Sequence, residues 1–409
     1  MKHLEHPFPF IWAVGIENTF IPHAREGMRP LDEFNLTQHY EFWREDLERV
    51  ASLGVSHLRW GPPWYQVQPG PNSFDWRWTD QVLEYMHLKK LTPILDLIHY
   101  GTPLWLEQGF DDPDYPAYVA DYAAAFAERY RDLVRYYTPL NEPMITAEYC
   151  GKLGQWPPYL VEENRQAHLI LQLVRGQQLT MQRLRAIVPS CVLVAVEALS
   201  WFYSAQRSLQ ANLDNWLDLR FLSFDLVTGQ LTPDQSGYQY LLTHGSNPAE
   251  IERVLAQAQP FDWFGVNFYP WSGGKVRQDA AGNYHIKRNS LIGQHLECVL
   301  QLAYQKTRLP LMVTETSAKR DQTGRARWMA ETLAAVHDCR SAGMPVIGYT
   351  WFPVFSMIDW LYRLDRRPLA KHLLHLGLWD CRFDAANILQ RHEPPLVAEY
   401  RRYLSHNLS

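Results

Sequence analysis

Short apolar runs and helical patterns alternate along the whole 409-residue chain. Eight of the runs are nearly continuous in apolar residues instead of alternating with polar ones, as strands of a parallel sheet buried on both faces require. We predict strands at 10–15, 57–60, 93–98, 133–138, 192–196, 263–267, 311–314 and 346–350. We predict helices at 40–53, 78–88, 118–134, 165–188, 249–258, 290–305, 324–342 and 396–404. Eight strands alternating with eight helices predict an α/β fold, a single (β/α)8 TIM barrel.

No linker rich in Pro, Ser or Gly divides the chain, so we predict that residues 1–409 form one domain. The net charge of −5 and the lack of a basic run argue against a nucleic-acid partner. Residues 1–9 lack the apolar stretch of a signal peptide, and no segment of about 18 apolar residues occurs anywhere. We therefore expect a soluble cytoplasmic protein without a membrane partner. Its five scattered cysteines form no CxxC pair, which argues against a disulfide framework and a zinc site.

Two glutamates stand at the ends of predicted strands. Glu142 follows Asn141 and precedes Pro143, which stops the strand from continuing, and Glu315 ends the strand predicted at 311–314. The carboxyl ends of the strands build the active site of a (β/α)8 barrel. Two carboxylates there are what glycoside hydrolysis needs, because one protonates the leaving oxygen and the other attacks the anomeric carbon or activates water.

Other polar and aromatic residues stand at the same strand ends and suit the hydroxyls and rings of a sugar. They are Glu17, Arg59, His99, Asn141, Glu197, Asn267, Tyr269 and Trp351. The chain is also rich in aromatic residues, with 16 Trp and 22 Tyr, whose faces stack on the C–H faces of sugar rings. These features favour a carbohydrate ligand.

At these residues the chain resembles glycoside hydrolase family 1, the retaining β-glycosidases among the (β/α)8 hydrolases. The matching motifs are His39-Tyr40 with Glu45-Asp46-Leu47, Leu58-Arg59-Trp60, Ile98-His99-Tyr100, Asn141-Glu142-Pro143, Phe264 to Tyr269, Val313-Thr314-Glu315 and Gly348 to Trp360. The resemblance implies that Glu142 is the acid/base and Glu315 the nucleophile. It implies that Arg59 and Tyr269 hydrogen-bond Glu315 and keep it ionised.

The resemblance also implies how a substrate is held. We expect the substrate-binding residues to be His99, Asn141, Asn267, Trp351 and Asp359. The implied reaction uses no metal and no organic cofactor, and its partner is a small-molecule glycoside. The sequence does not specify the sugar, the leaving group or the oligomeric state.

The chain departs from the family pattern around the sugar. When the first strand is aligned without a gap, Phe20 falls where the family carries a sugar-binding Gln, and Asp359 stands where a Glu usually binds the far hydroxyls. Three hypotheses therefore remain open. The first is a β-glucosidase-like retaining β-glycosidase, the second a non-hydrolytic sugar-binding barrel, and the third a transglycosylase that passes the same covalent intermediate to another acceptor.

Overall fold

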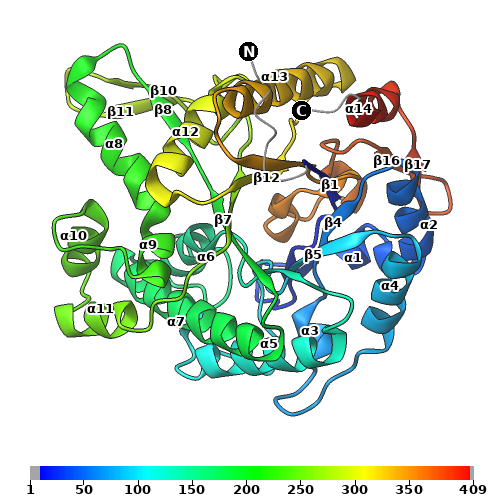
Figure 1. Ribbon diagram of the computed structural model, residues 1–409, viewed down its shortest axis with the longest axis horizontal. Helices are drawn as coiled ribbons and strands as arrows, with labels where there is room; N and C mark the ends of the chain where they lie inside the picture. The colour runs from blue at the N-terminus through cyan, green and yellow to red at the C-terminus, as the bar shows by residue number, and fades with distance from the viewer. Residues whose placement is uncertain (1–9, 406–409) are drawn as a thin grey trace.

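The computed structural model describes residues 10–405 and has a closed barrel of parallel strands at its centre (Figure 1). The barrel strands are β1 (Ile11–Gly15), β4 (His57–Trp60), β5 (Thr92–Asp96), β6 (Tyr136–Thr138), β7 (Val192–Ala198), β9 (Trp263–Asn267), β12 (Leu311–Thr316) and β13 (Val346–Trp351). Each overlaps one of the eight predicted segments, so the (β/α)8 prediction is confirmed. The predictions for residues 1–9 and for one domain over 1–409 extend beyond the described residues and stay predictions.

Helices surround the barrel (Figure 1). Those overlapping predicted segments are α2 (His39–Ser52), α4 (Arg77–Leu88), α5 (Tyr115–Tyr130), α7 (Glu163–Ile187), α11 (Pro248–Leu255), α12 (His295–Thr307), α13 (Gln322–Ser341) and α14 (Pro395–Ser405). The others are α1 (Glu33–Leu36), α3 (Trp64–Val67), α6 (Pro143–Ala147), α8 (Gln210–Asp218), α9 (Leu222–Thr228) and α10 (Ser236–Thr243). Side chains define some of the boundaries. Asp321 caps α13 by accepting a hydrogen bond from the N–H of Gly324 at 2.7 Å.

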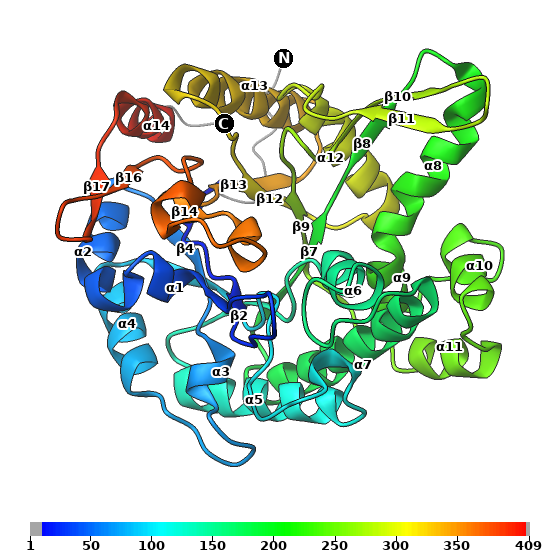
Figure 2. The same ribbon diagram turned by 180° about the vertical axis from the view of Figure 1, so that it is seen from behind.

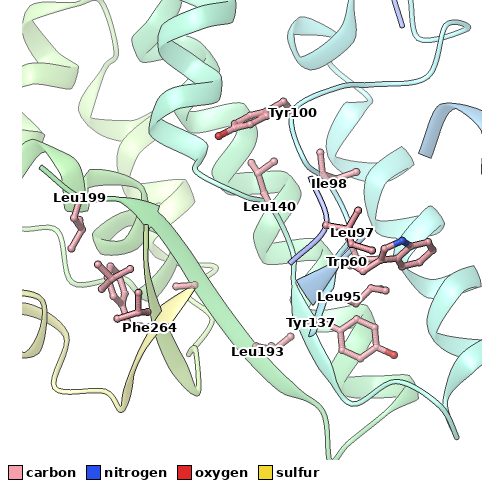
Figure 3. Packing of buried hydrophobic residues seen from close by; sticks show 14 of the residues in the cluster. Trp60, Leu95, Leu97, Ile98, Tyr100, Tyr137, Leu140, Leu193, Leu199 and Phe264 are labelled. Atoms are coloured by element: carbon pink, nitrogen blue, oxygen red, sulfur yellow. The ribbon is translucent and has the colours of Figure 1, made fainter. Parts of the chain in front are cut away.

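The main hydrophobic core lies between the barrel and the helices. Figure 3 shows part of it, with Leu95 beside Trp60 and Tyr137, its partners in the strand register. Successive residues of a strand face opposite sides, so Ile94 and Asp96 point into the barrel. The interior holds a separate apolar cluster of Ile11, Ala13, Ile94, Met312 and Ile347. Polar side chains occupy the carboxyl ends of the strands above this cluster.

The register changes where β12 carries Glu315. Val313 pairs with Val266 of β9, whereas Glu315 lies opposite Asn267, so one extra residue is inserted into β12 between these pairs. Such a bulge re-aims the side chains that follow it. It places Glu315 beside Asn267, whose side-chain amide contacts Glu142.

A second sheet projects from the barrel. Its strands are β8 (Trp201–Tyr203), β10 (Gly273–Gln278) and β11 (Tyr284–Lys287) in the order β11-β10-β8, and α8 lies along it (Figures 1 and 2). We call this sheet with α8 the wing. It has its own small core of Leu209, Leu213 and Val276. The sequence pattern did not predict the wing.

The described residues also form three short strand pairs. They are β2 (Phe20–Ile21) with β3 (Leu31–Asp32), β14 (Met357–Ile358) with β15 (Leu373–Leu374), and β16 (Asp380–Phe383) with β17 (Leu389–His392). Within residues 10–405, no helix combines the length and the apolar character that crossing a membrane requires.

Candidate active site

A cavity of about 900 Å³ opens at the carboxyl ends of the barrel strands. Of the residues predicted from the sequence, its wall contains Glu142, Glu315, His99, Tyr269 and Asp359. The fold therefore brings the two glutamates, which are far apart in sequence, to one cavity.

Glu142 joins β6 to α6 in a left-handed backbone conformation, with φ 44° and ψ 62°. This conformation is uncommon for a residue other than glycine and is frequent at functional sites. Its N–H donates to the carbonyl of Val196 at 3.1 Å. Pro143 then begins α6, where its fixed φ suits the first turn of a helix. The local sequence thus turns the carboxyl group of Glu142 out of the strand and into the cavity.

Neutral groups hold the Glu142 carboxyl. Asn267 donates from Nδ2 to Oε1 at 2.7 Å, and the Tyr100 hydroxyl donates to Oε2. Burial, reinforced by the nearby Glu315 carboxylate, raises the pKa of Glu142 to about 7. Glu142 therefore carries a proton at pH values below about 7.

A charged group holds Glu315. The guanidinium of Arg59 donates from Nη1 to Oε1, and the Tyr269 hydroxyl donates to Oε2 at 2.6 Å. Glu315 thus accepts a charge-assisted hydrogen bond from a guanidinium, which Glu142 does not. The surroundings of the two glutamates thus differ in the way that an acid and a nucleophile require.

Arg59 is itself fixed by a second carboxylate. Nε and Nη2 donate to Asp96 Oδ1 at 3.2 and 3.0 Å, and Nη2 also donates to Asn141 Oδ1 at 2.7 Å. Arg59 is fully buried. Burial lowers the pKa of Arg59, but Asp96 and Glu315 outweigh it and raise the pKa above its ordinary value. The guanidinium is therefore a permanent charge held against Glu315.

His99 belongs to the same network. Its Nδ1 lies 3.1 Å from Asp96 Oδ2, and its Nε2 lies 3.1 Å from Nδ2 of Asn141. Its ring stacks on Phe352 with centroids 6.0 Å apart and an angle of 7° between the planes. The ring is thus oriented from both nitrogens and from one face.

Asn141 and Asn267 lie beneath the cavity wall and do not form part of it. Their amides are linked, since Asn267 Nδ2 lies 3.3 Å from Asn141 Oδ1, and Thr314 donates to Asn267 Oδ1 at 2.7 Å. The pair connects Glu142 to Arg59. Their predicted contact with a sugar stays a prediction.

Asp359 lines the cavity from the loop after β13. Its Oδ1 accepts a hydrogen bond from the N–H of Leu361 at 3.0 Å, and its Oδ2 lies 3.6 Å from Lys319 Nζ. The side chain remains 22% exposed. One carboxylate oxygen therefore has room to accept a further hydrogen bond.

Trp351 does not form part of the cavity wall, so its predicted contact with a substrate stays a prediction. Its indole is fully buried in the main core and donates to the carbonyl of Leu376 at 3.1 Å. Trp360 forms part of the cavity wall instead, and its ring contacts Tyr100 with centroids 5.2 Å apart. The sequence places Trp351 at the end of a strand, but it does not tell which side of the strand the indole occupies.

Phe20 also lies outside this cavity, buried with its ring 4.9 Å from that of Phe34. Glu17 lines the cavity from the end of β1. Its Oε1 accepts hydrogen bonds from Thr19 N and Oγ1 at 3.1 and 2.6 Å, and burial raises its pKa. Of these two residues that follow β1, Glu17 lines the cavity and Phe20 does not.

Sequence reasoning missed the contact between Tyr100 and Glu142. Tyr100 lies in the loop after β5 with a positive φ of 76°, and its hydroxyl donates to Glu142. The motif Ile98-His99-Tyr100 was the available signal, but it does not reveal the partner of the phenol.

The described residues contain no group of three or more His, Cys, Asp or Glu side chains arranged to hold a metal ion. The five cysteines are all free thiols, and four of them are buried.

Comparisons with known proteins place these features in a family. The family model described as "Glycosyl hydrolase family 1" matches residues 32–290, more than half of the chain. The thermostable β-glucosidase B of Thermobispora bispora is 25% identical, over 90% of this chain and 86% of that protein. A 1,4-β-D-glucan glucohydrolase of Thermotoga neapolitana is 24% identical over 156 residues, and that match spans only 37% of its length.

Solved structures show the same fold. The family 1 β-glucosidase of Thermotoga maritima superposes with a TM-score of 0.83 at 17% identity, and 98% of each chain is covered. The same enzyme in complex with castanospermine gives a TM-score of 0.85. Because the family model covers more than half of the sequence, we conclude that the chain belongs to glycosyl hydrolase family 1.

Proposed function

We propose that the protein is a retaining β-glycosidase that hydrolyses O-glycosidic bonds in small β-glycosides. One observation carries the proposal: two carboxyl groups line the same cavity, one held by neutral donors and the other by a buried arginine. The names of the relatives, which include β-glucosidases, favour a β-glucoside as substrate.

In the first step, the protonated carboxyl of Glu142 donates its proton to the glycosidic oxygen while a Glu315 oxygen attacks the anomeric carbon. The bond to the leaving group breaks, and a covalent glycosyl-enzyme forms at Glu315. Arg59 and Tyr269 stabilise the carboxylate before attack and again after its release. No metal takes part in this scheme.

In the second step, the ionised Glu142 accepts a proton from a water molecule, which attacks the anomeric carbon from the opposite side. The bond to Glu315 breaks, and the sugar leaves with its β configuration retained. For this double displacement we expect the two carboxyl groups to lie about 5–5.5 Å apart in the substrate complex.

The sugar ring would lie against the part of the wall that contains Glu17, His99, Asp359 and Trp360. Carboxylate oxygens and the imidazole suit hydroxyl groups, and the indole suits an apolar sugar face. This placement supports a monosaccharide as the unit that is released.

The test uses Glu142→Ala and Glu315→Ala on a nitrophenyl β-glucoside, with Glu128→Ala on the exposed face of α5 as the matched control. Glu142→Ala should form the glycosyl-enzyme, because a nitrophenolate leaves without a proton, and should then stall. Azide should rescue it and give the β-glycosyl azide. Glu315→Ala should lose several orders of magnitude in rate, and azide should yield at most the α product.

If Glu142→Ala gave the α-glycosyl azide and Glu315→Ala the β-glycosyl azide, the two roles would have to be exchanged. Hydrolysis that is unchanged in both variants would refute the proposal. An α anomer as the first product in NMR would refute retention. Binding of glycosides without turnover would favour a sugar-binding barrel, and release accelerated by added alcohols would favour a transglycosylase.

A further inference from the structure

The two proposed catalytic strands divide the barrel rim into unequal parts. In the closed order β1-β13-β12-β9-β7-β6-β5-β4, strands β12 and β6 separate β9 and β7 from the other four. The groups suited to the sugar follow the larger part, since Glu17 follows β1, His99 follows β5 and Asp359 follows β13. The wing follows β7 and β9 (Figure 2). A glycoside lying across Glu142 and Glu315 therefore has its leaving group on the wing side.

The wing presents an aromatic wall to the cavity. Phe202, Trp216 and Ile286 line the cavity and pack on the small core of the wing. Trp271 is 36% exposed, and its ring stacks on Tyr269 at 4.7 Å with an angle of 8°. Since Tyr269 also donates to Glu315, the stacked pair of Tyr269 and Trp271 connects the proposed nucleophile with the aromatic wall. A flat aromatic group fits such a surface.

The same wall carries positive charge. Arg288, at the end of β11, lines the cavity and is exposed, and within residues 10–405 its guanidinium has no carboxylate within 4.0 Å. Arg220 also lines the cavity, and its Nη1 lies 3.9 Å from Oε2 of Glu148, close to the limit of an ion pair. Arg288 and Arg220 thus have only one carboxylate, Glu148, within 4.0 Å among residues 10–405, whereas Asp359 at the sugar end lies 3.6 Å from its own cation, Lys319.

The charge of Arg288 acts on Tyr149, another residue of the cavity wall. Burial raises the pKa of Tyr149, and the charge of Arg288 partly opposes this shift. Tyr149 lies after α6 and lines the same cavity.

We propose that the wing forms a leaving-group subsite for a flat aromatic aglycone that carries an anionic group such as a carboxylate. The ring would lie against Trp216 and Trp271, and the anion would accept hydrogen bonds from Arg288 and Arg220. The inference rests on the proposed function, because it assigns the leaving group of that reaction.

The test compares two substrates with the same sugar, 3-carboxyphenyl and 3-carbamoylphenyl β-D-glucoside, which differ in charge but hardly in shape. At low salt, kcat/KM of the wild type should favour the carboxylate about fivefold, and added salt should reduce this preference. Arg288→Met and Arg220→Met should each bring the ratio close to one. Arg277→Met, an exposed arginine of β10 outside the cavity wall, is the matched control and should keep the wild-type ratio.

An equal ratio in the wild type, or an unchanged ratio in Arg288→Met, would overturn the subsite and leave the glycosidase proposal intact. If the wild type cleaves neither glucoside, binding of 3-hydroxybenzoate and 3-hydroxybenzamide is measured by tryptophan fluorescence. Tighter binding of the acid that is lost in Arg288→Met would support the subsite without any catalysis. No preference for the acid would overturn it.

Discussion

The Glu142 carboxyl is held by one phenol and one amide, both neutral, whereas Glu315 faces a guanidinium. The two neutral donors lower the pKa of Glu142, but burial and the neighbouring Glu315 carboxylate outweigh them. The guanidinium of Arg59, in contrast, places a positive charge beside the Glu315 carboxyl. The different roles proposed for the two glutamates therefore depend on three neighbouring side chains, Tyr100, Asn267 and Arg59.

Tyr100→Phe tests how the phenol sets the pKa of Glu142. The phenol stabilises the ionised carboxylate, so its loss should raise the pKa of Glu142 above the present value of about 7. Because the acid form is needed for the first step, kcat/KM should fall above about pH 7 in the wild type and at higher pH in the variant. The pH dependence of kcat/KM for an aryl β-glucoside measures this shift.

Tyr122→Phe is the control, since Tyr122 is a buried tyrosine whose hydroxyl has no hydrogen-bond partner in residues 10–405. It should leave the pH profile unchanged. A basic limb that moves to lower pH in Tyr100→Phe would contradict the role given to the phenol.

Arg59→Met should damage both activity and stability. The substitution leaves Asp96 and Glu315 buried without their cation, which costs about 3–5 kcal/mol of the free energy of unfolding. Hydrolysis should fall by at least about 100-fold, because Glu315 loses the group that holds it. Arg59→Lys keeps the positive charge but not the forked geometry of the guanidinium. Its activity and stability should therefore lie between those of the wild type and those of Arg59→Met.

Urea denaturation and steady-state kinetics give the two readouts. Wild-type activity in a folded Arg59→Met variant would show that Arg59 does not support Glu315.

At the scale of elements, the sequence predicted the strands that are buried on both faces. Their apolar runs are continuous, so β12 and β13 could be recognised without any partner. The wing could not be recognised in the same way. Strand β10 begins with two glycines and then alternates buried and exposed residues, and its partner β8 has only three residues. Such a pattern is as typical of a loop as of an edge strand.

The direction of individual side chains was the second feature that the sequence could not predict. The strand ends that carry Glu142 and Glu315 could be identified because polar residues follow apolar runs. The positions of Phe20 and Trp351 required the direction of each side chain after its strand, which depends on tertiary packing and not on spacing. The cationic wall around Arg288 was also beyond the sequence, because its parts come from separate segments.

Gly273→Ala tests the junction between the wing and the barrel. Gly273 has φ +130°, and an added Cβ would overlap the carbonyl oxygen of Trp201, its pairing partner in β8. We expect a loss of about 1–3 kcal/mol in the free energy of unfolding and a higher KM for aryl glycosides, because the wall that holds the aglycone shifts.

Gly282→Asn is the matched control at the turn of the same hairpin. Its φ is +87°, which Asn tolerates, and its nearest neighbour lies 3.9 Å away. It should change neither quantity. Equal effects of the two substitutions would contradict the role of the junction.

Over the whole molecule, the last described helix packs on the first strand of the barrel. Tyr400 of α14 is fully buried and donates from its hydroxyl to the carbonyl of Ala13 in β1 at 2.8 Å. This hydrogen bond joins positions 387 residues apart. Residues from the two ends of the described chain thus share one core.

Tyr400→Phe should remove this hydrogen bond without creating a cavity. We expect a loss of about 1 kcal/mol and a decrease in Tm of about 1–2 °C. Activity at 25 °C should not change, because Tyr400 lies outside the cavity wall. Tyr403→Phe, on a half-buried residue of the same helix, is the control for thermal unfolding. A Tm decrease of the same size in both variants would contradict the specific contact.

The separate core of the wing has a consequence for how proteins of this kind diversify. Leu209, Leu213 and Val276 stabilise the wing without touching the apolar cluster inside the barrel. Substitutions that reshape the wing can therefore accumulate without loosening the strands that carry Glu142 and Glu315. Natural selection, or a laboratory library restricted to residues 201–217 and 275–288, can alter the preferred leaving group while the bond-breaking groups stay in register.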